Sequence, residues 1–200
     1  MGIADLIAES EELIQWLDRR IDGVEVKPDD RLRLAAACLD MAMEHHKAIV
    51  LLISRRLYGS ALALVRLIFE SYVRGIWLHG CATDSEILRF QRGKLDKTFA
   101  ALIAEVEKLE AFDVGVLSQV KIASWKAMNS FTHTGTSQIA SRLTETTIGS
   151  NYAEQDVAHA LNFSNAIGLL SAAAVGLITD DNKFANEIFE RAMVFWKQEP

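Results

Sequence analysis

The stretch SALALVRLIFESYVRGIWL, residues 60–78, is apolar around almost its whole helical circumference. Its Leu, Ile, Val and Phe side chains follow the period of an α-helix and do not alternate as they would in a strand. A helix that is hydrophobic on all sides is buried among other elements of a protein. The stretch therefore predicts the central helix of a helical bundle.

The segments on both sides of this helix are also helical in period. Residues 31–56 carry two apolar stripes and follow Asp29 and Asp30, either of which suits the N-cap position. Thr83 and Glu86 have the spacing of a capping box that would begin a further helix. No segment of strand-like alternation and no internal repeat occurs. We predict an all-α, up-and-down bundle of six to eight helices.

The length of 200 residues suits one hydrophobic core, and we expect a single domain over residues 1–200. Between residues 130 and 150, twelve of 21 residues are Ser, Thr or Gly. This composition predicts a loop-rich crossover at about 134–150. The stretch ALNFSNAIGLLSAAAVGLI, residues 160–178, approaches the length of a membrane span, but Asn and Ser residues interrupt it, which favours a buried core helix.

The formal net charge of −6 argues against a general attraction to nucleic acid or to an anionic membrane. RNA is a possible partner that the net charge does not support. Cys38 and Cys81 are isolated, and no signal-like basic segment precedes the first helix, so we expect a cytoplasmic protein. Neither a metal nor a cofactor is expected.

A polar seam interrupts the central helix at Arg66, Glu70 and Arg74, each four residues apart and on one face. One interpretation is a surface ladder in which Glu70 pairs with both arginines. The other is a partly buried seam whose second arginine leaves an excess positive charge for an anion, a ligand or a partner. Both interpretations stay open on the sequence.

His45 and His46 interrupt the apolar stripes of residues 31–56, so at least one of them is expected inside the bundle. Adjacent helical residues point about 100° apart and cannot easily share one metal ion. We expect a hydrogen bond from one of these histidines to Glu70, because consecutive antiparallel helices lie side by side. Both histidines are candidates for a ligand- or anion-binding site.

The stretch MNSFTHTGTSQ, residues 128–138, places His133 at the end of a predicted helix, where Gly135 suits the left-handed C-cap position. A histidine there can simply complement the helix dipole. However, Asn129 precedes His133 by one helical turn, so both side chains can face the same space. Together they offer a donor, an acceptor and a proton shuttle, and they are our candidate catalytic residues.

Three stretches together resemble a group of uncharacterised bacterial all-helical families: HHKAIVLLI (45–53), YGSALALVRLIFESYVRGIWL (58–78) and MNSFTHTGTSQI (128–139). These families are distantly similar to the HEPN superfamily, whose active members are metal-independent ribonucleases of toxin and phage-defence systems. The resemblance spans residues 41–139 and implies a HEPN-like core, usually with the site at a dimer interface.

The HEPN pattern places an arginine and a polar residue before a histidine one turn later. Asn129 and His133 match the last two positions, but Met128 stands where the arginine belongs. The resemblance implies that Arg66 or Arg74 would supply the missing cation. Two functions follow as hypotheses: a dimeric binding or structural module with a polar pocket, and a HEPN-like ribonuclease. An arginine close to His133 in an open site would favour catalysis, and a closed buried network would favour the structural role.

Overall fold

The computed structural model describes residues 2–196. Within this range there are nine α-helices, one short 3₁₀ helix at Glu110–Phe112 and no β-strand. The α-helices are α1 (Ile3–Ile21), α2 (Asp30–Ser54), α3 (Tyr58–Gly80), α4 (Asp84–Gln91), α5 (Phe99–Val106), α6 (Val116–Thr132), α7 (Thr136–Ala140), α8 (Glu154–Ile178) and α9 (Asn182–Trp196). The all-α class is confirmed. The helices number one more than the six to eight expected, because the five-residue α7 lies in the stretch predicted as a loop.

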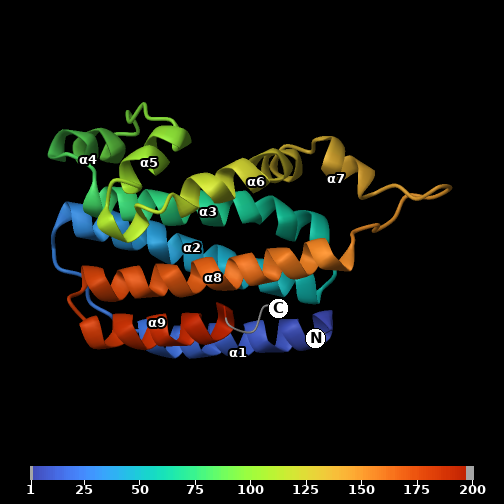
Figure 1. Cartoon of the computed structure of the whole chain (residues 1–200), viewed down its shortest axis with the longest axis horizontal. Coiled ribbons are helices and arrows are strands. Elements are labelled where there is room, and N and C mark those ends of the chain that lie inside the picture. The colour runs from blue at the N-terminus through green and yellow to red at the C-terminus, as the bar shows by residue number, and fades with distance from the viewer. Residues whose placement is uncertain (1, 197–200) are drawn as a thin grey trace.

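The antiparallel pair α2 and α3 forms the centre of the bundle (Figure 1). Asp29 is the N-cap of α2 and accepts a hydrogen bond from the Leu32 amide. On α3, the side chains of Ile68, Phe69 and Trp77 are fully buried, as expected for a helix that is apolar on all sides. The stretch that predicted a central helix therefore lies at the centre.

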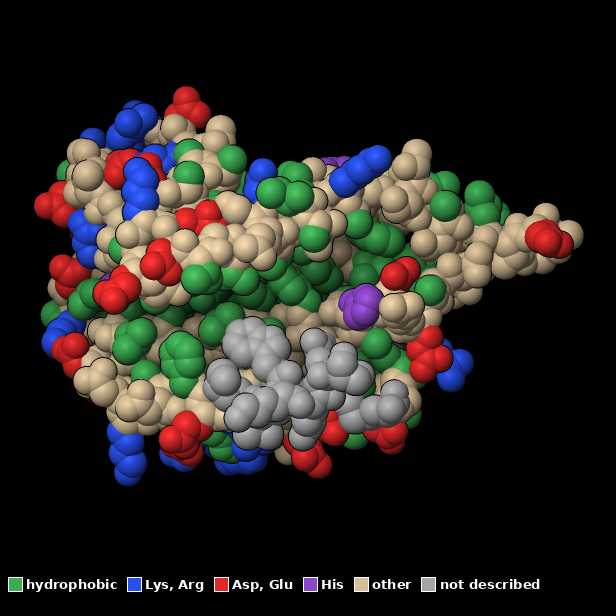
Figure 2. All heavy atoms as spheres, in the orientation of Figure 1, with side chains coloured by type: hydrophobic (Ala, Val, Ile, Leu, Met, Phe, Trp, Pro, Cys, Tyr) green, Lys and Arg blue, Asp and Glu red, His purple; other side chains and the backbone are tan. Residues whose placement is uncertain are grey.

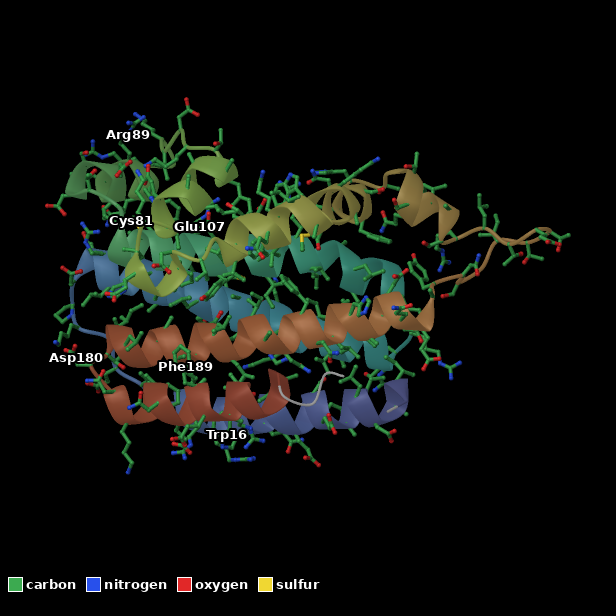
Figure 3. The ribbon with its side chains drawn as sticks, in the orientation of Figure 1. Trp16, Cys81, Arg89, Glu107, Asp180 and Phe189 are labelled. Carbon is green, nitrogen blue, oxygen red and sulfur yellow. The ribbon has the colours of Figure 1, made fainter. Side chains whose placement is uncertain are left out.

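Other helices cover this pair on two sides (Figure 1). On one side, α8 packs against α2 and α3, with α1 and α9 beyond it. Trp16, labelled in Figure 3, lies where α1 meets α9, and the Arg191 guanidinium is 4.4 Å from the centre of its ring. On the other side, α5 and α6 lie on α3. In Figure 2, hydrophobic side chains gather in a hollow between α6 and α8.

Helix α8 is long and apolar enough to cross a membrane, as its sequence suggested. However, 72% of its most apolar window is buried against the rest of the described chain. At Gly168 it comes so close to α2 that an added Cβ would lie 2.5 Å from Nδ1 of His46. This helix therefore packs as a core element of the bundle.

The crossover between α6 and α8 contains α7 and a hairpin-like segment, residues 141–151, which we call the arm. A single β-bridge joins Leu143 and Ile148. The Gly149 amide donates to the Arg142 carbonyl over 2.9 Å. The arm projects from one end of the bundle (Figure 1), beyond α7. The segment predicted as loop-rich is therefore largely free of helix, but its backbone is internally hydrogen-bonded.

Candidate functional site

Arg66 on α3 and His133 at the end of α6 meet at the protein surface. The guanidinium Nη1 of Arg66 lies 2.8 Å from Nε2 of His133. The two residues are 67 positions apart in the sequence and are brought together because α6 lies along α3. The Thr132 hydroxyl donates to the Ala63 carbonyl over 3.2 Å and so fixes the end of α6 against α3.

The Arg66 side chain is held from two further directions. Its Nε donates to Oε1 of Glu70 over 2.8 Å, and its Cζ lies 4.7 Å from the centre of the Trp125 ring. The Trp125 ring in turn stacks on Phe99 with ring centres 4.9 Å apart. The side chains of Arg66 and Glu70 are 21% and 20% exposed. The Arg66–Glu70 part of the seam is thus a half-buried pair in a defined geometry, rather than a mobile surface ladder.

The hydrogen bond between Arg66 and His133 fixes the proton on the imidazole ring. A guanidinium can only donate, so Nε2 of His133 must accept, and the neutral ring carries its proton on Nδ1. The Nη2 group of Arg66 makes no hydrogen bond within residues 2–196. The site therefore presents N–H donors from both residues to the solvent side, which suits an anion.

Asn129 lies one turn before His133 on α6, on the stripe that also holds Trp125. Its Oδ1 atom is buried and has no hydrogen-bond partner in the described part of the chain. Buried carbonyl oxygens are nearly always paired with protein or ordered water, so this atom is an exception that requires a donor. The unused acceptor of Asn129 is thus buried one turn from His133, while the Arg66–His133 contact lies at the surface.

The turn after His133 is strained. Thr134, and not Gly135 as the sequence suggested, adopts the left-handed conformation, with φ of 54°. Gly135 is needed for another reason: an added Cβ would lie 2.7 Å from Oγ of Ser130. Its amide donates to the Ser130 carbonyl over 2.7 Å. A β-branched residue with positive φ is unfavourable, and such strain concentrates at functional sites.

Arg74 does not join this site. Its Cζ lies 5.8 Å from the ring of Phe90 on α4, and it makes no ion pair with Glu70 among the described residues. The predicted seam is therefore split, because Arg66 and Arg74 face different neighbouring helices. Of the two arginines considered as the missing cation, only Arg66 reaches His133.

His45 and His46 also lie away from the site. His46 is buried, and its Nε2 lies 2.8 Å from Oδ1 of Asn165 on α8. The expected hydrogen bond to Glu70 is wrong, because the buried face of α2 at His46 meets α8 while Glu70 pairs with Arg66. His45 is half-buried, and partial burial lowers its pKa. No group of three or more His, Cys, Asp or Glu side chains suited to a metal ion occurs in the described range.

Three residues of the site were not predicted from the sequence as site residues: Trp125, Thr132 and Lys121. The Lys121 ammonium lies 5.6 Å from the centre of the Trp125 ring, on which Arg66 also lies. Trp125 and Asn129 are four residues apart, so the spacing of a Trp-x-x-x-Asn-x-x-x-His stripe was a usable signal. The stripe marks the face of α6 that contacts Arg66.

Fold and site together define an all-α helical bundle with a surface arginine–histidine pair. The chain belongs to a family of unknown function (DUF6988), whose profile matches residues 39–198. No curated protein and no solved structure matches it. An uncharacterised family was expected from the sequence, whereas the similarity to the HEPN superfamily stays a prediction.

Proposed function

We propose that the protein is a cytoplasmic binding module that holds an anionic group at Arg66 and His133. What supports this most is the 2.8 Å contact between Arg66 Nη1 and His133 Nε2 at the surface. Glu70 occupies only the Nε side of the guanidinium, so Nη2 remains for a ligand. A planar guanidinium binds phosphate or carboxylate oxygens in pairs, which gives both affinity and orientation.

An anion titration tests this function. Inorganic phosphate or pyrophosphate is expected to raise the thermal unfolding midpoint, because a ligand at about 100 times its Kd stabilises a fold by about 2.7 kcal/mol. Arg66→Gln is expected to abolish the rise. Arg74→Gln is the matched control, since Arg74 lies on the same helix and outside the site. Equal responses of the wild type and Arg66→Gln would exclude Arg66 as the binding group.

A second function is supported by the position of Arg66. The resemblance to HEPN ribonucleases lacks an arginine at Met128, and Arg66 supplies a guanidinium within hydrogen-bond reach of His133. In such an enzyme Arg66 would turn from Nε2 of His133 to the phosphate and stabilise its charge, which would free that nitrogen to take the proton of the ribose hydroxyl. The side chain of His133 is exposed, so an RNA strand could reach it.

An RNA-cleavage assay in excess EDTA separates the two functions. A ribonuclease predicts cleavage that survives EDTA and falls by about 100-fold or more in His133→Ala, since general acid–base catalysis contributes about 10²–10⁴-fold. His159→Ala, which removes an exposed histidine of α8, is the matched control. Absence of cleavage of several RNAs by the wild type would leave anion binding as the function.

A further inference from the structure

The arm, residues 141–151, carries apolar side chains that stay exposed in the described part of the chain. Ile148 is 83% exposed and Leu143 is 52% exposed. The hairpin is nevertheless ordered internally, since the Thr144 amide donates to the Thr147 carbonyl over 2.9 Å. A two-stranded hairpin has no core of its own, and exposed apolar side chains in a defined structure mark contact surfaces.

Glu145 lies at the tip of the arm and is the only acidic residue between Asp113 and Glu154. The hydroxyls of Thr144 and Thr147 lie 2.7 Å apart and close the turn on which it stands. The carboxylate is exposed and makes no ion pair within residues 2–196. Figure 2 shows an acidic side chain near the projecting end of the arm.

The outer face of α6 has the complementary properties. Ile122 is 85% exposed there, and Lys126 is exposed on the same face. Helix α6 has two basic residues, Lys121 and Lys126, and no acidic one, although the net charge of the chain is −6. His133 borders this face, because Lys126 precedes it by about two helical turns.

The arm cannot make this contact within one molecule, because it points away from α6 of its own chain (Figure 1). We propose that the protein forms a two-fold dimer in which the arm of each copy lies on α6 of the other. The Glu145 carboxylate then binds Arg66 and His133 of the second copy, and Ile148 packs against Ile122. This inference rests on the proposed function, and it names the anion as a side chain of a second copy.

The dimer is weak, because two short hairpins bury less surface than a standard interface. We expect a Kd of about 10–100 µM in low salt. Salt raises this Kd, because the Debye length falls from about 10 Å at 0.1 M to about 3 Å at 1 M and the charges lie near the surface. Sedimentation equilibrium of the full chain at several concentrations measures both effects.

A charge exchange tests the contact itself. Glu145→Arg and Arg66→Glu, each alone, are expected to raise the dimer Kd by about tenfold or more, because two opposite-charge contacts become like-charge contacts. A mixture of the two variants restores the dimer, since every contact in the mixed pair again joins an arginine to a glutamate. Ile148→Asp is a second variant in an exposed position that does not disturb the core.

Glu110→Arg, which reverses an exposed acidic residue outside the arm, is the control and leaves the Kd unchanged. A wild type that stays monomeric at about 1 mM, or a dimer that Glu145→Arg does not weaken, overturns the inference. Phosphate binding by the Glu145→Arg monomer tests the proposed function separately. If Glu145→Arg does not bind phosphate, anion binding at Arg66 is overturned. If the variant binds phosphate and its dimer Kd is unchanged, only the role of the arm is overturned.

Discussion

Trp77→Ala is expected to lower the free energy of unfolding by about 4 kcal/mol, the usual cost of truncating a buried tryptophan. Trp77 is fully buried on α3, and its Nε1 donates to Oε2 of Glu105 over 2.6 Å. The Lys97 ammonium lies 4.7 Å from the centre of its ring and pairs with both Glu105 and Glu86. Removing the indole therefore leaves a cavity and weakens the contact that holds α4 and α5 on α3.

Two variants make this prediction specific, with denaturant unfolding at pH 7 as the measurement. Trp77→Phe keeps an aromatic ring at the position but removes the Nε1 donor and part of the indole volume, so a smaller loss of about 2 kcal/mol is expected. Trp16→Ala is the matched control, because Trp16 is only half-buried between α1 and α9 (Figure 3). A loss below about 1 kcal/mol for Trp77→Ala would mean that the surrounding helices close the cavity.

Features that depend on nearby residues were predictable from the sequence. The Thr83–Glu86 capping box is confirmed, with the Thr83 amide donating to Oε2 of Glu86 over 2.8 Å. The end of α6 at His133 is confirmed as well, and of the two ion pairs of the Glu70 ladder only the pair with Arg66 forms among the described residues. In the capping box and in the Arg66–Glu70 pair about one helical turn joins the partners, so the helical period allows the contact. The period does not decide it alone, since Arg74 has the same spacing from Glu70 and lies on Phe90 instead.

Features that depend on packing between distant helices were not predictable. Asn165 binds His46 from 119 residues away, and nothing in the local pattern of α2 indicates which helix lies over it. The conformation at Thr134 is a second case, since Gly135 is the residue that the local rule for helix ends selects. There the close approach of Gly135 to Ser130 decides the turn.

His46 is the group that should make the fold sensitive to mild acid. The Asn165 amide donates to the Ser10 hydroxyl over 2.8 Å, and that hydroxyl donates to the Leu6 carbonyl over 2.7 Å. Oδ1 of Asn165 therefore faces His46, whose Nε2 must donate to it. A second proton has to go on Nδ1, which faces the close backbone of Gly168. Burial accordingly lowers the pKa of His46 to about 4.

The direction in which the free energy of unfolding changes with pH follows from the pKa of His46 in the folded and in the unfolded chain. The pKa of His46 is 6.5 in the unfolded chain and about 4 in the folded protein, so the unfolded chain takes up the proton at a higher pH. The stabilising contribution is complete above pH 6.5 and is lost as the pH falls toward 4, by about 3 kcal/mol in total. Glu86 contributes in a lower window, because its hydrogen bond with Lys97 lowers its pKa to about 2 from 4.5.

Urea unfolding between pH 7 and pH 4 measures this loss, and His46→Gln identifies its source. Glutamine keeps an N–H donor for Asn165 but cannot titrate, so the variant should lose most of the pH dependence while the wild type shows it. Some slope remains, because partial burial also lowers the pKa values of His45 and His79. His159→Gln, on the exposed side of α8, should keep the full wild-type slope. If His46→Gln keeps it too, the acid sensitivity comes from other groups, and the Ser10–Asn165–His46 chain does not control it.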